Sequence, residues 1–159
     1  MTKQKTLYNR LLPGQEVFGS FETADILKVN RGIINNDMKQ GHLPAGTKIK
    51  WGKTTRTVFS RKELYWISLF YQLHAIGLTK RHADEIVRSI RSQPHDYILL
   101  GSSADHGAGA AALYFKNYLS VQVLDELNKT RSTIIINYKK VRQDVDERIR
   151  RHGEKLLQP

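Results

Sequence analysis

The sequence predicts an α+β fold: an N-terminal winged helix-turn-helix, with four helices and a β-hairpin wing, followed by a small α/β region that ends in a helix. Three observations lead to this prediction. Two short helical patterns flank a turn within residues 21–44, and alternating apolar and polar residues follow at 47–59. An apolar run at residues 132–138 precedes a charged amphipathic segment. We expect three parts: an arm at residues 1–20, the winged region at 21–92 and the α/β region at 93–159.

The first predicted helix begins at Thr23, whose hydroxyl can accept a hydrogen bond from a backbone N–H of the first turn. Asn30, Arg31 and Gly32 then interrupt the apolar pattern, as a turn does. Gly41 ends the second helix. These signals place two short helices around a tight turn.

The second predicted helix covers residues 31–40, and we expect Ile33, Ile34 and Met38 to face the core. Its polar side chains fall mainly on the other side: Arg31, Asn35, Asn36 and Lys39. Asp37 would repel phosphate, so we expect it to pair with Lys39 or another basic residue. A second helix that carries Asn and Arg outward is typical of a helix-turn-helix.

The next segment reads as a β-hairpin, with strands at residues 47–51 and 55–59 around Gly52-Lys53. Alternation puts Ile49 and Trp51 on one face and the lysines of the first strand on the other. A hairpin with cations near its tip can reach backbone phosphates or a minor groove. We therefore interpret it as a basic wing.

Two further helices complete the first half. Ser60 and Glu63 form the sequence signature of a capping box, which opens a predicted helix at residues 61–76. Another helix is predicted at residues 79–90, after Gly77. Both carry an apolar stripe at helical spacing, so they are expected to form the core.

The second half is predicted as a strand at residues 96–101, a strand at 132–138 and a charged helix at 141–157, with a weaker helix at 119–128. Residues 111–114 fit either a strand or a helix start. The apolar stripe of the last helix, formed by Val141, Val145 and Ile149, has two interpretations. It either completes the fold of one chain or pairs two subunits, and we expect dimerisation through residues 93–159.

Charge points to a polyanionic partner, because the chain of 159 residues has a net charge of +11. Residues 1–92 carry 16 basic against 7 acidic residues, a net of +9, whereas residues 93–159 carry 10 against 8, a net of +2. The basic half is therefore the half with the predicted helix-turn-helix.

Several classes of site are not expected. The chain has no cysteine, which excludes disulfides and thiolate metal sites. The six histidines are not spaced as a ligand set, and Asp105-His106 has no nucleophile in register, so we expect no metal, no cofactor and no catalytic residue. The loop at residues 101–109 lacks the spaced Gly-Lys-Ser/Thr of a P-loop. With neither an apolar run of membrane length nor a signal-peptide core, a cytoplasmic location is expected.

The order of elements from residue 21 to residue 90 resembles the DNA-binding domain of MerR-type winged helix-turn-helix transcription regulators. The resemblance is carried by TAD at residues 23–25, KQGHLP at 39–44, RTVFS at 56–60 and AIGLT at 75–79. It covers about 70 of the 159 residues. The resemblance implies a bacterial or phage homodimer that binds a two-fold operator of double-stranded DNA.

Carried onto this sequence, the resemblance and the basic wing mark twelve candidate DNA-binding residues. Asn and Arg side chains can form paired hydrogen bonds with adenine and guanine edges. The candidates are Thr23, Asn30, Arg31, Asn35, Asn36, Lys39, Lys48, Lys50, Lys53, Thr55, Arg56 and Arg61.

The leading hypothesis is thus a dimeric, sequence-specific transcription regulator without catalytic activity. The alternative is an architectural or recombination accessory factor, such as an excisionase-like or partition-like protein. A third hypothesis, an enzyme or small-molecule binder in the C-terminal half, has no residue-level support.

Overall fold

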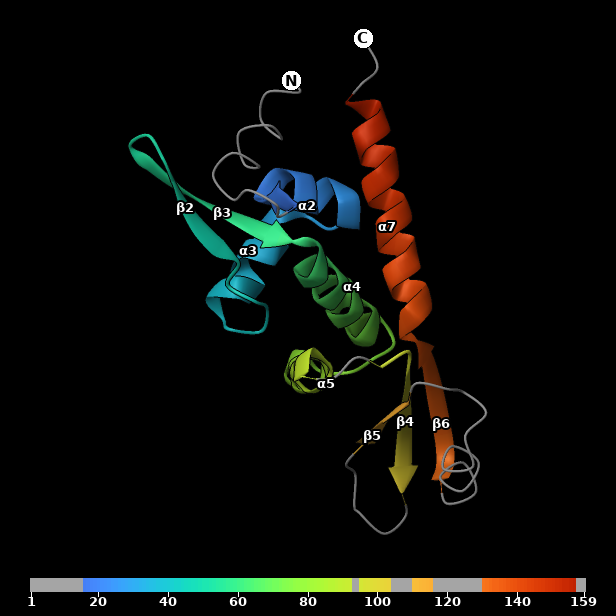
Figure 1. Cartoon of the computed structure of the whole chain (residues 1–159). Coiled ribbons are helices and arrows are strands. Elements are labelled where there is room, and N and C mark those ends of the chain that lie inside the picture. The colour runs from blue at the N-terminus through green and yellow to red at the C-terminus, as the bar shows by residue number, and fades with distance from the viewer. Residues whose placement is uncertain (1–15, 93–94, 104–109, 116–129, 157–159) are drawn as a thin grey trace.

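The computed structural model describes residues 16–92, 95–103, 110–115 and 130–156 (Figure 1). These ranges contain five helices and two three-stranded antiparallel sheets, which confirms the predicted α+β class. The helix predicted at residues 119–128, Asp105-His106 and most of the proposed N-terminal arm lie outside the described residues.

The helices and strands follow one another along the chain in two groups, one within residues 16–92 and one within residues 95–156. The helices are α2 (Ser20–Leu27), α3 (Arg31–Lys39), α4 (Arg61–Ala75), α5 (Lys80–Ser92) and α7 (Tyr138–Lys155). The strands are β1 (Val17–Gly19), β2 (Thr47–Trp51), β3 (Thr54–Ser60), β4 (Tyr97–Ser103), β5 (Ala110–Phe115) and β6 (Thr130–Asn137).

Helix α2 begins earlier than predicted. Its N-cap is Gly19, whose backbone N–H donates to the Glu22 carboxylate at 2.8 Å. Thr23 was wrongly predicted as the cap: it lies inside the helix and is fully buried. The cause is tertiary, because β1 pairs with β3 and Phe18 lies opposite Phe59, which places the helix start at Ser20. Residues 17–20 therefore belong to the folded part of the chain and not to an arm.

Helix α3 is capped by Asn30, whose side-chain oxygen accepts a hydrogen bond from the Gly32 N–H at 2.7 Å. Ile34 is fully buried, as predicted, but Ile33 is 49% exposed, so its predicted core position is wrong. Successive residues of a helix point about 100° apart. Here the inward side is occupied by Ile34 and by the buried Asp37.

The predicted hairpin is present, with Gly52 at a φ of 60° in the turn between β2 and β3. Ile49 is buried and Trp51 is half-buried, whereas Lys48 and Lys50 are exposed, as the alternation predicts. Strand β3 pairs with both β1 and β2, so the hairpin is anchored at its base to the N-terminus of the described chain.

Helix α4 begins with the predicted capping box. The Ser60 N–H donates to the Glu63 carboxylate at 2.7 Å, and the Glu63 N–H donates to the Ser60 hydroxyl at 3.3 Å. Helix α5 buries Ala83, Ile86, Val87 and Ile90, the predicted stripe. Ile76, the last residue of the helix predicted at 61–76 and expected at the end of its apolar stripe, lies just beyond α4 and is 45% exposed, so its expected core position is wrong.

The second sheet has the order β5-β4-β6. Residues 111–114 lie in strand β5. The sequence leaves both a strand and a helix start possible for this segment. Tyr138, predicted as the end of a strand, is the first residue of α7.

Helix α7 packs along α2 and α4 of the same chain, on the opposite side of the molecule from the hairpin (Figure 1). Val141, Val145 and Ile149 are buried in one cluster with core residues of α2, α4 and α5. The stripe therefore completes the fold of a single chain, and its interpretation as a subunit interface is wrong because the stripe is already covered.

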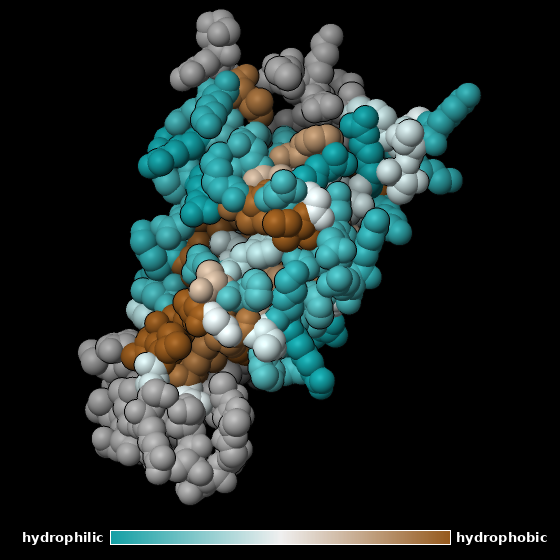
Figure 2. All heavy atoms as spheres, turned by 180° about the vertical axis from the view of Figure 1, so that it is seen from behind, coloured by the Kyte–Doolittle hydropathy of each residue, from teal (hydrophilic) through white to brown (hydrophobic). Residues whose placement is uncertain are grey.

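The described residues on the rear face are mainly polar. Figure 2 shows hydrophilic residues over most of the rear face, with hydrophobic residues gathered in its lower half beside the residues drawn in grey. Within the described part of the chain, no helix combines the length and the apolar character needed to cross a membrane.

Candidate nucleic-acid interface

An open groove of about 420 Å³ lies between the start of α2, the start of α3 and strand β3. Its lining brings together the second helix of the predicted pair and the returning strand of the hairpin. The lining residues are Gly19, Ser20, Phe21, Glu22, Arg31, Asn35, Thr55, Arg56 and Thr57.

Arg31 is held at this groove by two contacts. Its Nε donates to the Ser20 hydroxyl at 3.2 Å, and its guanidinium carbon lies 3.8 Å from the centroid of the Phe21 ring. The Phe21 side chain is 71% exposed, so this cation–π pair stands at the surface. The Arg31 guanidinium at the start of α3 is thus held in place by two side chains at the start of α2.

The remaining candidates on α3 have different surroundings. Asn36 and Lys39 are exposed, and Asn35 is half-buried in the wall of the groove. Asn30 is also exposed, but its side-chain oxygen caps the helix. Asn36 and Lys39 are therefore the candidates on α3 most open to a partner.

The hairpin carries the other cations. Lys48, Lys50, Lys53 and Thr55 are exposed on β2, the turn and β3. Arg56 is half-buried, with its guanidinium carbon 4.9 Å from the centroid of a Trp51 ring. By the strand register, Lys48 and Lys50 share a face of the hairpin with Thr55 and Thr57 of the groove, whereas Arg56 lies on the other face with Ile49 and Trp51.

Cations on this side differ in their partners from several arginines and a lysine on α5 and α7. Among the described residues, no carboxylate forms an ion pair with any of Arg31, Lys39, Lys48, Lys50 or Lys53. On α5, by contrast, Arg81 pairs with Glu85 at 3.1 Å and Arg88 pairs with Asp84 at 2.8 Å. The charge of the α3 and hairpin side is therefore not neutralised within the described structure.

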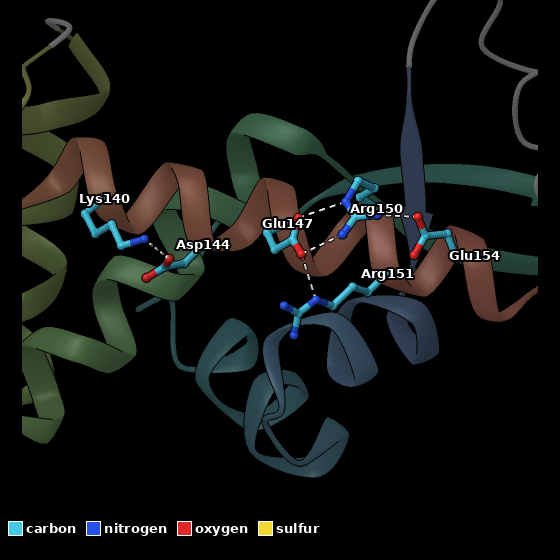
Figure 3. Close-up of polar contacts among 6 residues, drawn as sticks. All are labelled: Lys140, Asp144, Glu147, Arg150, Arg151 and Glu154. Atoms are coloured by element: carbon cyan, nitrogen blue, oxygen red, sulfur yellow. Dashed lines mark hydrogen bonds and ion pairs between the residues drawn. The ribbon is translucent and has the colours of Figure 1, made fainter.

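Helix α7 shows the same contrast in Figure 3, where its charged side chains pair with one another. Lys140 contacts Asp144 at 2.9 Å, and Glu147 accepts hydrogen bonds from both Arg150 and Arg151. Those two guanidinium groups hold the pKa of Glu147 at about 2. These arginines already have acidic partners on their own helix.

Two predicted DNA-binding residues are not part of this surface. Thr23 is fully buried, so its hydroxyl cannot reach a nucleic acid. Arg61 pairs with Glu16 through Nε at 2.7 Å and with Asp146 at 2.8 Å. Because two carboxylates hold its guanidinium, Arg61 links Glu16, just before β1, and α7 to the start of α4, and this candidate lies away from the groove and the hairpin.

Sequence reasoning missed the part of the groove formed by Ser20, Phe21 and Thr57. Phe21 is an aromatic residue at the start of a helix, and the pattern alone does not tell whether such a ring is buried. Its contact with Arg31 depends on how two helices meet. The predicted basic partner of Asp37 is Lys80, 43 residues further along the chain.

Within the described ranges, no group of three or more His, Cys, Asp or Glu side chains could hold a metal ion. The comparisons with protein-family models and with curated proteins give no match for this chain. Its function is therefore inferred from the geometry and charge of its own residues.

Proposed function

We propose that this chain is a sequence-specific double-stranded DNA-binding protein that acts as a transcription regulator. Helix α3 enters the major groove, and the β2–β3 hairpin lies along the adjacent phosphate backbone as a wing. The observation that carries this proposal is the groove in which Arg31 and Asn35 of α3 meet Thr55 and Arg56 of the hairpin. One continuous surface thus offers both a helix for the bases and cations for the backbone.

The side chains on α3 and on the hairpin have the chemistry needed to contact bases and phosphates, respectively. The major groove of B-DNA is about 12 Å wide and admits an α-helix. Lysine and arginine side chains without acidic partners gain most from phosphate, because they give up no internal ion pair. Asn36 can form two hydrogen bonds with an adenine edge, and Arg31 can do so with guanine. The hairpin lysines supply affinity, and α3 supplies selectivity.

The resemblance to MerR-type regulators supports the same arrangement, since the helices and the hairpin follow in the order that the resemblance implies. It also implies a homodimer on a two-fold site. Because the α7 stripe is buried, we propose that any such pairing uses another surface.

The proposal is tested by selecting bound duplexes from a random-sequence pool with the full chain. We expect one enriched sequence. A two-fold symmetric sequence supports a dimeric regulator, whereas clustered direct repeats favour the accessory-factor alternative. Recovery of an unenriched pool contradicts sequence-specific binding.

A charge-matched pair of variants tests the wing. Lys48, Lys50 and Lys53 are changed together to alanine, and Lys139, Lys140 and Lys155 of α7 serve as the control. We expect the hairpin variant to bind all duplexes more weakly and its log–log salt slope to fall by up to about 0.9 for each lost phosphate contact. Equal losses in the two variants contradict a wing on the hairpin.

A further inference from the structure

Ile33 is an apolar residue on the exposed side of α3. Its side chain is 49% exposed, while Ile34 next to it is fully buried. Ile33 is also not among the partly buried residues that pack against the core, although Val29 and Met38 are. No folding role in the described structure accounts for this side chain.

The neighbours of Ile33 belong to the proposed DNA-facing surface. With about 100° between successive residues, the outward face of α3 runs from Arg31 and Asn35 at the groove, across Lys39 and Gly32, to Asn36. Ile33 forms the far edge of this face, between Asn36 and the buried Asp37. Gly32 is exposed and has no side chain, so the helix backbone can come close to a partner there. Residues three apart on a helix are neighbours, so Ile33 and Asn36 project side by side.

The major groove has one apolar feature at its base edges, the C5-methyl group of thymine. An exposed isoleucine gains free energy when its apolar surface is buried against such a group. Asn36 beside it can read adenine through two hydrogen bonds. Ile33 and Asn36 together therefore match a DNA site in which a thymine and an adenine lie close together.

We propose that Ile33 is a specificity-determining residue that packs against a thymine methyl group, next to an adenine bound by Asn36. This inference rests on the proposed DNA-binding function and names the bases that one end of α3 selects. The bound site contains an A·T pair beneath Ile33.

The test replaces each thymine of the selected duplex with uracil, one position at a time. This removes the methyl group and leaves base pairing intact. At one position we expect the wild-type chain to bind about fourfold more weakly, which corresponds to the burial of one methyl group. Ile33→Ala should bind the thymine and uracil forms equally at that position. Circular dichroism and thermal unfolding check that the variant is folded.

Ile76→Ala is the matched control, because Ile76 is 45% exposed at the end of α4. It should keep the wild-type ratio between thymine and uracil. If the wild-type chain binds a selected sequence but distinguishes uracil at no position, the inference is wrong and the proposed function stands. If Ile33→Ala keeps the full ratio, another residue makes the contact and the inference is again wrong. If no sequence is selected, the proposed function fails and the inference falls with it.

Discussion

Asp37 is a buried acidic residue near the centre of α3, directed toward α4 and α5 and next to Ile33 at the edge of the proposed interface. Its carboxylate accepts hydrogen bonds from the Lys80 ammonium at 2.6 Å and from the Tyr71 hydroxyl at 3.1 Å. Burial, together with the nearby Asp37 carboxylate, raises the pKa of Tyr71, which keeps its phenol protonated as a donor. Asp37 thus ties α3 to α4 and α5 and sets which side of α3 faces outward.

Replacing Asp37 with alanine should lower the free energy of unfolding by about 1–3 kcal/mol, because the Lys80 ammonium and the Tyr71 hydroxyl then lose their acceptor. Chemical denaturation measures the change. Glu85→Ala is the control: it removes an ion pair with Arg81 in which both side chains are more than half exposed, and it should cost at most about 0.5 kcal/mol. Similar costs for the two variants would show that Asp37 is not the anchor of α3.

At the scale of elements, the hairpin is held at its base by a close backbone approach. Gly46 precedes β2 with a φ of 66°, and a Cβ at this position would lie 2.7 Å from the Thr57 methyl carbon and 2.8 Å from the Val58 carbonyl oxygen. Gly52 in the turn has a similar φ of 60°, but a Cβ there would meet nothing within 4 Å. The two glycines share a positive φ and differ in how crowded their surroundings are.

This difference makes a matched pair of substitutions. Gly52→Ala should cost about 1 kcal/mol of stability, the strain of a left-handed non-glycine residue. Gly46→Ala should cost about 1–3 kcal/mol more, because the added methyl group overpacks the base of the hairpin. Thermal unfolding measures both. Equal melting temperatures would mean that β3 shifts freely and that the base of the wing is not rigid.

At the scale of the whole molecule, α7 joins the two halves of the sequence into one core. Its buried stripe contacts the same cluster as Phe18, Leu64 and Phe70. Near its C-terminal end, a ring nitrogen of His152 lies 2.9 Å from the Asp25 carboxylate of α2. Lys28 and His152, through their hydrogen bonds, lower the pKa of Asp25. The orientation of α2, and hence of α3, depends on residues more than a hundred positions away.

Ile149→Ala should destabilise the chain by about 2–5 kcal/mol, since Ile149 is 4% exposed and its truncation leaves a cavity. Because the stripe is covered within one chain, the loss in midpoint caused by Ile149→Ala should be the same at every protein concentration, whether or not the chain pairs through another surface. Chemical denaturation over a hundredfold range of concentration measures this. A midpoint that rises with concentration in the wild type, and less so in the variant, would restore the stripe as a subunit interface.

The sequence by itself determined the class of the fold, the hairpin and the ranges of α4 and α5. These follow from local rules: the capping box at Ser60, the period of two in β2, the helical stripe of α5 and the glycine stops. It also located the cations of the hairpin, since alternation alone places Lys48 and Lys50 opposite Ile49.

Only the tertiary structure decided which individual side chains remain available to a partner. Thr23 is buried because β1 pairs with β3, and Arg61 is neutralised by carboxylates 45 and 85 residues away. Ile33 stays 49% exposed although Asp37, four residues further on, is buried against Lys80. The stripe of α7 is covered by helices of its own chain. In each case the partner residue is distant in sequence. Its contribution to the folding free energy therefore cannot be predicted from the local sequence pattern.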